Sequence, residues 1–125
     1  MNFQFDRTLR LLNASDYQTV FNQSRLKVST PEILFLAIHN QQHQPRLGLV
    51  IAKKNVRLSV QRNRIKRIVR ETFRLQQHEL GNLDVIVLAR RGLDKMDNQQ
   101  LQQVCTELWQ QLKKRALKQA PVREA

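Results

Sequence analysis

Residues 60–77 constrain the fold more than any other segment, because two chemically different faces recur there with helical period. At about 100° per residue, one face is almost entirely apolar. It comprises Ile65, Ile68, Val69, Thr72 and Phe73. The opposite face comprises Asn63, Lys66, Arg67, Arg70 and Arg74. Such a helix has to bury the first face against another element and leave the second in solvent.

The remaining segments predict both strands and helices. Asn13, followed by an acid at Asp16, indicates a helix start and a helix over about 13–22. Asp97 indicates the start of a last helix over 97–118. Short β-rich runs predict strands at 25–30, 32–39, 46–52 and 84–89. The order is α-β-β-β-α-β-α without strict alternation, which favours a small α+β sandwich.

The length of 125 residues favours a single domain. Leu, Ile, Val and Phe make up 39 of these residues, which is enough for a folded core that needs no disulfide bonds or bound metal ions to hold it together. Three Gly, three Pro and the absence of a low-complexity linker give no sign of an internal boundary. We therefore expect one domain over 1–118 and a flexible tail over 119–125.

The composition also argues against several classes of protein. The longest apolar run, residues 33–38, is far shorter than the roughly 20 residues of a membrane span, and the first residues lack the apolar core of a secretory signal. The single cysteine, Cys105, excludes an internal disulfide and a cysteine-rich zinc site. His39, His43 and His78 show no metal-ligand spacing. We expect a cytoplasmic protein with no catalytic residue and no metal ligand of its own.

The net charge of +12 is concentrated in one part of the chain. Residues 53–74 hold nine basic residues and one acid, Glu71, so they carry a net charge of +8. Arg62, Lys66, Arg70 and Arg74 follow one another at i,i+4, where like charges destabilise an isolated helix. A solvated basic face is the simple interpretation. The lack of interleaved acids and the adjoining lysines favour a polyanion as the partner.

The residues of this segment also resemble a known motif. Arg62-Asn63-Arg64-Ile65-Lys66-Arg67, after Lys53-Lys54-Asn55-Val56-Arg57, resembles the RNR motif of the bacterial ribonuclease P protein subunit family. The resemblance extends to Arg10-Leu11-Leu12, to the helix with Tyr17 and Phe21, to Arg46-Leu47-Gly48-Leu49 and to Asp84-Val85-Ile86-Val87. It implies an RNA-binding domain with the fold of domain 2 of ribosomal protein S5, in which the RNR helix forms a left-handed crossover. Topology rules alone would favour a right-handed one.

The resemblance implies a subunit of a ribonucleoprotein that removes the 5′ leader from precursor tRNA. The catalytic RNA would perform the hydrolysis with Mg²⁺ held mainly by RNA, and the protein would bind no cofactor. Its partners would be the ribonuclease P RNA and precursor tRNA, with no membrane and no DNA. Tyr17 and Phe21 would face the single-stranded leader. The RNA-binding residues would be Lys53, Lys54, Arg57, Arg62, Asn63, Arg64, Lys66, Arg67, Arg70 and Arg74.

Several alternatives stay open at this point. Tyr17 and Phe21 could simply pack the core, while Cys105 and Trp109 lie on or beside the apolar stripe of the last helix and indicate packing. Arg90 and Arg91 could extend the basic surface. Three alternative hypotheses for the function remain. The chain could be a ribosomal or assembly protein that binds RNA without processing it, a DNA-binding regulator, or a protein-only nuclease. No helix-turn-helix pair and no carboxylate cluster supports the last two.

Overall fold

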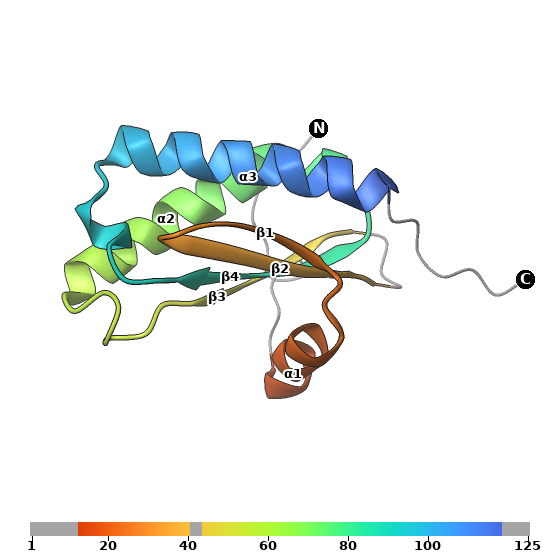
Figure 1. Cartoon of the computed structure of the whole chain (residues 1–125), viewed down its shortest axis with the longest axis horizontal. Helices are drawn as coiled ribbons and strands as arrows, with labels where there is room; N and C mark the ends of the chain where they lie inside the picture. Colours follow the sequence, from red (N-terminus) through yellow and green to blue (C-terminus); the bar gives the residue numbers. More distant parts are fainter. Residues whose placement is uncertain (1–12, 41–43, 119–125) are drawn as a thin grey trace, which may run out of the picture.

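The computed structural model describes residues 13–40 and 44–118. The elements follow the expected order, and Figure 1 shows their arrangement. Arg10-Leu11-Leu12, His43 and the expected tail over 119–125 lie outside the described residues. The elements are α1 (Ala14–Gln23), β1 (Leu26–Thr30), β2 (Ile33–His39), β3 (Arg46–Val50), α2 (Ser59–Gln76), η2 (Gln77–Glu79), β4 (Leu83–Ala89), η3 (Leu93–Lys95) and α3 (Asn98–Lys118).

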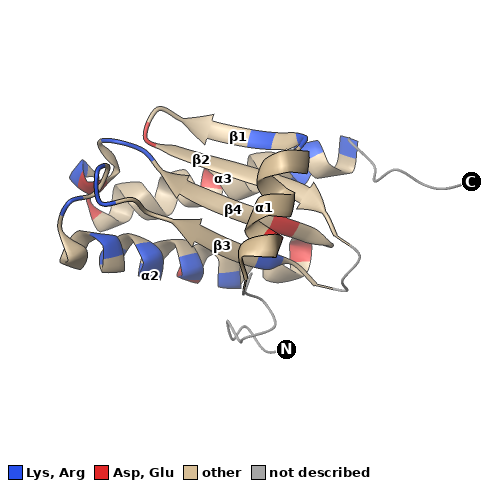
Figure 2. Cartoon of the chain, turned by 90° about the horizontal axis from the view of Figure 1, so that it is seen from below, with Lys and Arg blue, Asp and Glu red and all other residues tan. Residues whose placement is uncertain are grey.

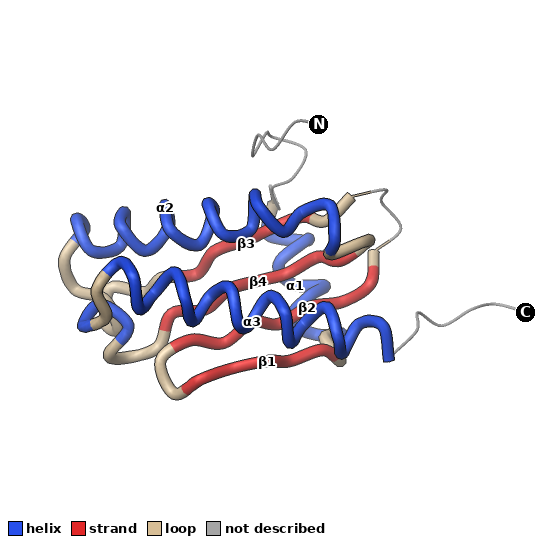
Figure 3. Tube along the Cα trace, turned by 90° about the horizontal axis from the view of Figure 1, so that it is seen from above, coloured by secondary structure: helices blue, strands red, loops and turns tan. Residues whose placement is uncertain are grey.

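The four strands form one mixed sheet in the order β1-β2-β4-β3. β2 pairs antiparallel with β1 and β4, whereas β3 pairs parallel with β4. The parallel pair requires a crossover, and α2 provides it. Seen from the side of α2 and α3 in Figure 3, the path β3–α2–β4 has the left-handed sense that the family resemblance implied. General topology rules favour the opposite hand.

The sheet separates two helical layers. α2 and α3 cover one face and α1 crosses the other, as Figures 1 and 3 show. Alternate strand residues point to opposite faces, so Phe35 and Val85 join the core under α2 and α3, while Leu36 and Ile86 meet Val20 of α1. The larger core is therefore on the side of the two long helices.

The core confirms the packing predicted for Cys105 and Trp109. Both are buried, and the Trp109 ring lies 4.5 Å from the Phe35 ring and 5.5 Å from the Phe73 ring, centroid to centroid. The indole Nε1 donates to Oγ1 of Thr72 at 2.9 Å, which explains why a hydroxyl is tolerated on the buried face of α2. Burial raises the pKa of the Cys105 thiol to about 12.

The helix starts confirm the capping residues predicted from the sequence. Oδ1 of Asn13 accepts a hydrogen bond from the Asp16 amide at 2.9 Å. Asp97 and Gln100 form a reciprocal pair, in which each side chain accepts from the other's backbone amide. α1 and α3 consequently begin at Ala14 and Asn98, each within a residue or two of the predicted start.

Candidate nucleic-acid interface

The exposed face of α2 lies along the β3 edge of the sheet. Ile65, Val69 and Phe73 are buried against the sheet and α3, so the side chains opposite them face solvent. Figure 2 shows Lys and Arg along this helix and in the loop before it. We define the basic strip by its solvent-facing members, which are Lys53, Lys54, Arg57, Asn63, Lys66, Arg67 and Arg70.

The cations of the basic strip have no intramolecular ion-pair partner within residues 13–40 and 44–118. The ion pairs found there involve Arg46, Arg74 and Lys113 instead. Six unneutralised cations on one loop and one helix face give this surface a positive potential that attracts anions. The charge concentration predicted from the sequence thus lies on one loop and one face of α2.

The loop that begins the basic strip is fixed at its centre. Nδ2 of Asn55 donates to the Ala89 carbonyl at 3.0 Å, and Val56 is fully buried. Both residues also donate their backbone amides to the Ala52 carbonyl at 3.0 Å. Lys53 and Lys54 therefore project from an anchored turn.

Arg62, the first arginine of the RNR motif, bonds to the loop that precedes it. Its Nη1 donates to the carbonyls of Val56 at 3.0 Å and Arg57 at 2.9 Å. These carbonyls lie just before the N-terminus of α2, which has no side-chain cap. The guanidinium of Arg62 thereby connects the basic loop to the helix.

Arg64, the second arginine of the motif, connects α2 to the segment before α3. Its Nε donates to Oε1 of Gln61 at 2.8 Å, its Nη1 to Oδ1 of Asn98 at 2.9 Å and its Nη2 to the carbonyl of Asp94 at 3.2 Å. Its planar fork of donors suits three acceptors in different directions. The sequence predicted that this side chain binds RNA; in the structure Nε, Nη1 and Nη2 each donate one hydrogen bond to an acceptor of the protein itself.

Arg74, at the last turn of α2, pairs with Glu71 one turn earlier on the same helix. The hydrogen bond to Arg74 lowers the pKa of the Glu71 carboxyl and raises that of the guanidinium. The pair neutralises the single acid within 53–74. Arg74 therefore differs from Arg67 and Arg70, which keep their charge unpaired among the described residues.

Tyr17 and Phe21, the two aromatic residues of α1, have different environments. The Tyr17 hydroxyl accepts a hydrogen bond from the Leu49 amide at 3.2 Å, and its ring lies directly over Gly48. A Cβ at position 48 would be 2.8 Å from the ring, so only glycine allows this approach. Phe21 is 44% exposed. Tyr17 fixes α1 to β3, and Phe21 leaves a ring in solvent.

A partly buried ion pair, which the sequence did not predict, joins β3 and β4 in the same region. Nε and Nη2 of Arg46 donate to the two carboxylate oxygens of Asp84 at 2.9 and 2.7 Å, and Asp84 is 4% exposed. Nδ2 of Asn40 donates to the same carboxylate, and Asp16 of α1 lies 3.7 Å from Arg46. The bond to Asp84 raises the pKa of the Arg46 guanidinium. An Asp opening an apolar strand was the available signal.

Within residues 13–40 and 44–118, no three His, Cys, Asp or Glu side chains gather closely enough to hold a metal ion. None of the helices in the same part of the chain has the length and apolar character needed to cross a membrane. The basic strip and the exposed aromatic ring of Phe21 are the candidate contacts for a nucleic acid that the sequence predicted and the structure leaves accessible.

A comparison with known protein families matches residues 5–113 to the ribonuclease P family. The chain belongs to the ribonuclease P protein family. It is similar to the ribonuclease P protein component of Chromohalobacter salexigens, with 50% identity over 116 residues, 93% of this chain and 91% of that protein. The protein component of Pseudoalteromonas translucida is 43% identical over 120 residues, 96% of this chain and 85% of that protein.

Solved structures of the same family share the fold. The Staphylococcus aureus ribonuclease P protein matches with a TM-score of 0.75 at 26% identity, covering 82% of this chain and 93% of that one. The Thermotoga maritima protein matches with a TM-score of 0.68 at 26% identity, covering 84% and 96%. The expected α+β topology is therefore confirmed.

Family membership also decides between the functions that the sequence left open. Ribonuclease P is an endoribonuclease of tRNA processing, and this chain is its protein subunit. The hypotheses of a ribosomal or assembly protein, a DNA-binding regulator and a protein-only nuclease give way to it. The basic strip therefore lies on the surface of a protein subunit whose partner in the ribonucleoprotein is RNA.

Proposed function

We propose that the basic strip binds RNA phosphates of the ribonuclease P catalytic RNA and of precursor tRNA close to the cleavage site. The observation that carries this proposal is the row of six cations without a carboxylate partner in the described residues, on a helix fixed by its buried face. Each phosphate contact releases counterions, so binding driven by this strip falls steeply with salt.

The structure supports a division of labour among the cations of the RNR region. Arg67 and Arg70 have guanidinium forks that are exposed and form no ion pair among the described residues, and such forks bind phosphate in a bidentate manner. Arg62 donates to the loop before α2, and Arg64 donates to Gln61, Asp94 and Asn98, so we assign both to holding the strip in place. Asn63 lies between them in the sequence and is exposed, which makes its amide available to a base or sugar.

Phe21 is our candidate for contact with the 5′ leader. Leaders vary in sequence, and stacking on an aromatic ring tolerates any base. The exposed ring of Phe21 lies on α1, which packs on the sheet face opposite α2 and α3. Tyr17, four residues earlier on α1, fixes the helix that carries Phe21, because its hydroxyl is bonded to β3 and its ring lies over Gly48.

The chemistry of cleavage belongs, in this proposal, to the RNA subunit. Mg²⁺ would be held mainly by RNA phosphates, and the protein would add affinity and local positive charge. We assign the protein no cofactor and no catalytic residue, and we place it in the cytoplasm with its substrate. Its partners are the catalytic RNA and precursor tRNA, not a membrane or DNA.

Reconstitution tests this function directly. The protein is combined with the ribonuclease P RNA of the same organism, and precursor tRNA cleavage is measured at low magnesium concentration. We expect the protein to raise kcat/KM, and the R67Q/R70Q variant to lose most of that gain. No stimulation by the wild-type protein, or cleavage by the protein without RNA, contradicts the proposal.

A further inference from the structure

A second group of cations lies at the edge of the sheet farthest from the basic strip. It combines the start of β1 with the last turns of α3, segments almost ninety residues apart in the chain. Its members are Arg25, Lys27, Lys114, Arg115 and Lys118, and all five are exposed. We call this group the β1–α3 corner. Figure 2 shows these Lys and Arg positions at one end of the molecule.

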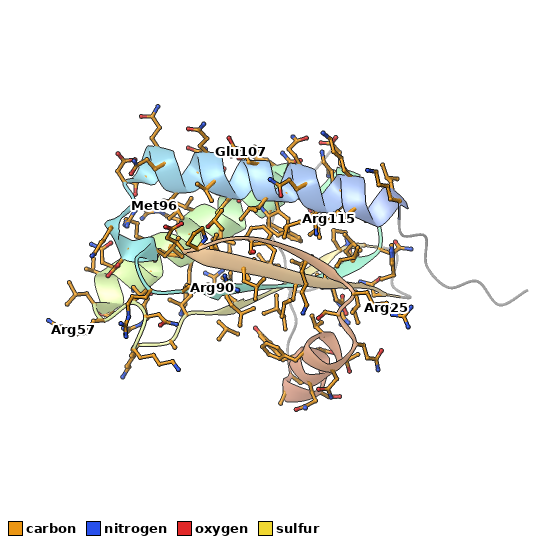
Figure 4. All side chains as sticks on the ribbon, in the orientation of Figure 1. Arg25, Arg57, Arg90, Met96, Glu107 and Arg115 are labelled. Atoms are coloured by element: carbon orange, nitrogen blue, oxygen red, sulfur yellow. The ribbon has the colours of Figure 1, made fainter. Side chains whose placement is uncertain are left out.

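One hydrogen bond joins the two segments of the corner. Nη1 of Arg115 donates to the Lys27 carbonyl at 2.6 Å, which places the end of α3 over the free edge of β1. Figure 4 labels Arg25 and Arg115 at the same end of the molecule, with Arg57 of the basic strip at the opposite end. The tertiary fold therefore brings the cations at the start of β1 and those at the end of α3 together.

None of the five cations forms an ion pair with a carboxylate within residues 13–40 and 44–118. The neighbouring Lys113 does so, because it faces α2 and meets Glu79 at 3.2 Å. The acid nearest along α3 is Glu107, two turns before Lys114, a rise of about 10 Å. The corner thus shares with the basic strip a concentration of cations without neutralisation.

Two local effects account for only part of this group. Cations in the last turn of a helix are favoured by the helix dipole, and this effect explains Arg115 and Lys118. A lysine on an edge strand discourages pairing with a strand of another chain, and this effect explains Lys27. Neither effect requires the two segments to bring their charges together, nor explains Arg25.

We propose that the β1–α3 corner is a second binding surface for the phosphate backbone of RNA, which engages an RNA segment different from the one on the basic strip. β1 and β3 are the two edges of the sheet, three strand spacings or about 14 Å apart. A phosphate bound on the outer face of α2 is therefore too distant to contact the β1 edge as well. The inference rests on the proposed function, since it takes RNA as the polyanion.

The variant K114Q/K118Q tests the corner while leaving the Arg115 contact intact. Binding to the ribonuclease P RNA alone, and of precursor tRNA to the reconstituted enzyme, is measured from 0.1 to 0.4 M salt. We expect the salt slope to fall by about 2 and the affinity by roughly tenfold in one of these two assays. The assay that responds identifies the RNA that occupies the corner.

Three further variants make the result decisive. Q99E/Q102E lowers the net charge by the same amount at the other end of α3, and we expect it to leave the salt slope unchanged. K27Q tests the strand side of the corner, with an expected slope change of about 1. R67Q tests the basic strip, and its slope change should add to that of K114Q/K118Q because the two surfaces are separate.

An unchanged salt slope for K114Q/K118Q in both assays overturns the inference. The inference also fails if this variant only lowers the melting temperature, because its cations then serve the helix end alone. The inference also fails if K114Q/K118Q and Q99E/Q102E lose RNA affinity and salt slope to the same extent, since the change in net charge alone would then explain the effect. If R67Q also leaves the slope unchanged, the proposed function of the strip fails as well, so the two failures are distinguishable.

Discussion

Nη1 of Arg64 lies 2.9 Å from Oδ1 of Asn98, across the junction between α2 and the first turn of α3. Arg64 belongs to the RNR motif, whereas Asn98 is on another helix, thirty-four residues later. The bond means that the direction of α2, and with it the direction of the basic strip, depends in part on a residue outside the strip. A motif arginine is therefore not automatically an RNA contact.

This relationship predicts that N98A and R64Q act on RNA binding through the same contact. We expect each to lower the free energy of unfolding by about 1 kcal/mol, with a double variant less destabilised than the sum. Both should weaken RNA binding while leaving its salt slope unchanged. Urea denaturation and binding at several salt concentrations measure the two effects.

R67Q is the matched control for that experiment. Its exposed guanidinium has no ion-pair partner in the described residues, so we expect no loss of stability and a salt slope smaller by about 0.9. A smaller slope for R64Q, together with unchanged affinity in N98A, would show that Arg64 contacts phosphate directly. The positioning role would then be wrong.

Gly48 is predicted to be irreplaceable as long as Tyr17 is present. A Cβ at this position would stand 2.8 Å from the ring and the hydroxyl oxygen of Tyr17. We expect G48A to lose about 1–3 kcal/mol of stability through overpacking, measured by urea denaturation. In a Y17L background the same substitution should cost much less. An equal cost in both backgrounds would show that the strain lies elsewhere.

Phe21 is predicted to act on the leader and not on the fold. Because its side chain is 44% exposed, we expect F21A to lower the free energy of unfolding by less than about 1 kcal/mol. Loss of one stacked base should weaken binding of a long-leader precursor tRNA by about 5- to 150-fold. The measurement compares this substrate with a precursor whose leader is one nucleotide long. Equal losses for both, with a lower melting temperature, would favour a packing role.

We expect the buried thiol of Cys105 to lower the free energy of unfolding at alkaline pH. Burial raises the pKa of its thiol to about 12, while the unfolded chain has a value near 9. The folded state therefore keeps the proton that the unfolded state releases. The contribution of the thiol is fully present below about pH 9 and declines as the pH rises from 9 to 12.

The measurement compares the pH dependence of unfolding in the wild type and in C105A, which lacks the titrating group. We expect the difference between them to change by up to about 1.4 kcal/mol per pH unit above pH 9, as the wild type loses stability. A thiol reagent should also react slowly with the native protein at about pH 8, where the buried thiol keeps its proton. Parallel pH profiles for the two proteins would contradict the assignment.

Local patterns in the sequence were sufficient to predict the helices and strands and to predict which face of α2 is buried. Asn13 and Asp97 start their helices because a side-chain oxygen satisfies free amides within the same turn, an interaction that depends only on neighbouring residues. The apolar stripe from Ile65 to Phe73 is buried because helical period alone places these residues on one side. The concentration of charge over residues 53–74 is equally local.

The roles of individual arginines were not predictable from that pattern. Arg62, Arg64 and Arg67 look alike in the sequence, but the loop before α2 provides acceptors for Arg62, and Asp94 and Asn98 provide distant acceptors for Arg64. The pairing of Arg46 with Asp84 was missed for the same reason, because the two residues become neighbours only when β3 and β4 align in parallel. Contacts between distant segments are set by the packing of whole elements.

The sequence by itself determined which segments are helices and strands, which side of α2 is buried, and that a polyanion is the partner, since each depends on periodicity, caps and charge within one segment. Its resemblance to a family added the crossover hand, which general topology rules would have reversed. Tertiary structure alone decided that Tyr17 lies over Gly48, that Arg64 bonds to Asn98, and that Lys27 and Arg115 meet at one corner. The physical reason is that these contacts join residues far apart in the chain, and only the packing of the sheet against its helices brings them within bonding distance.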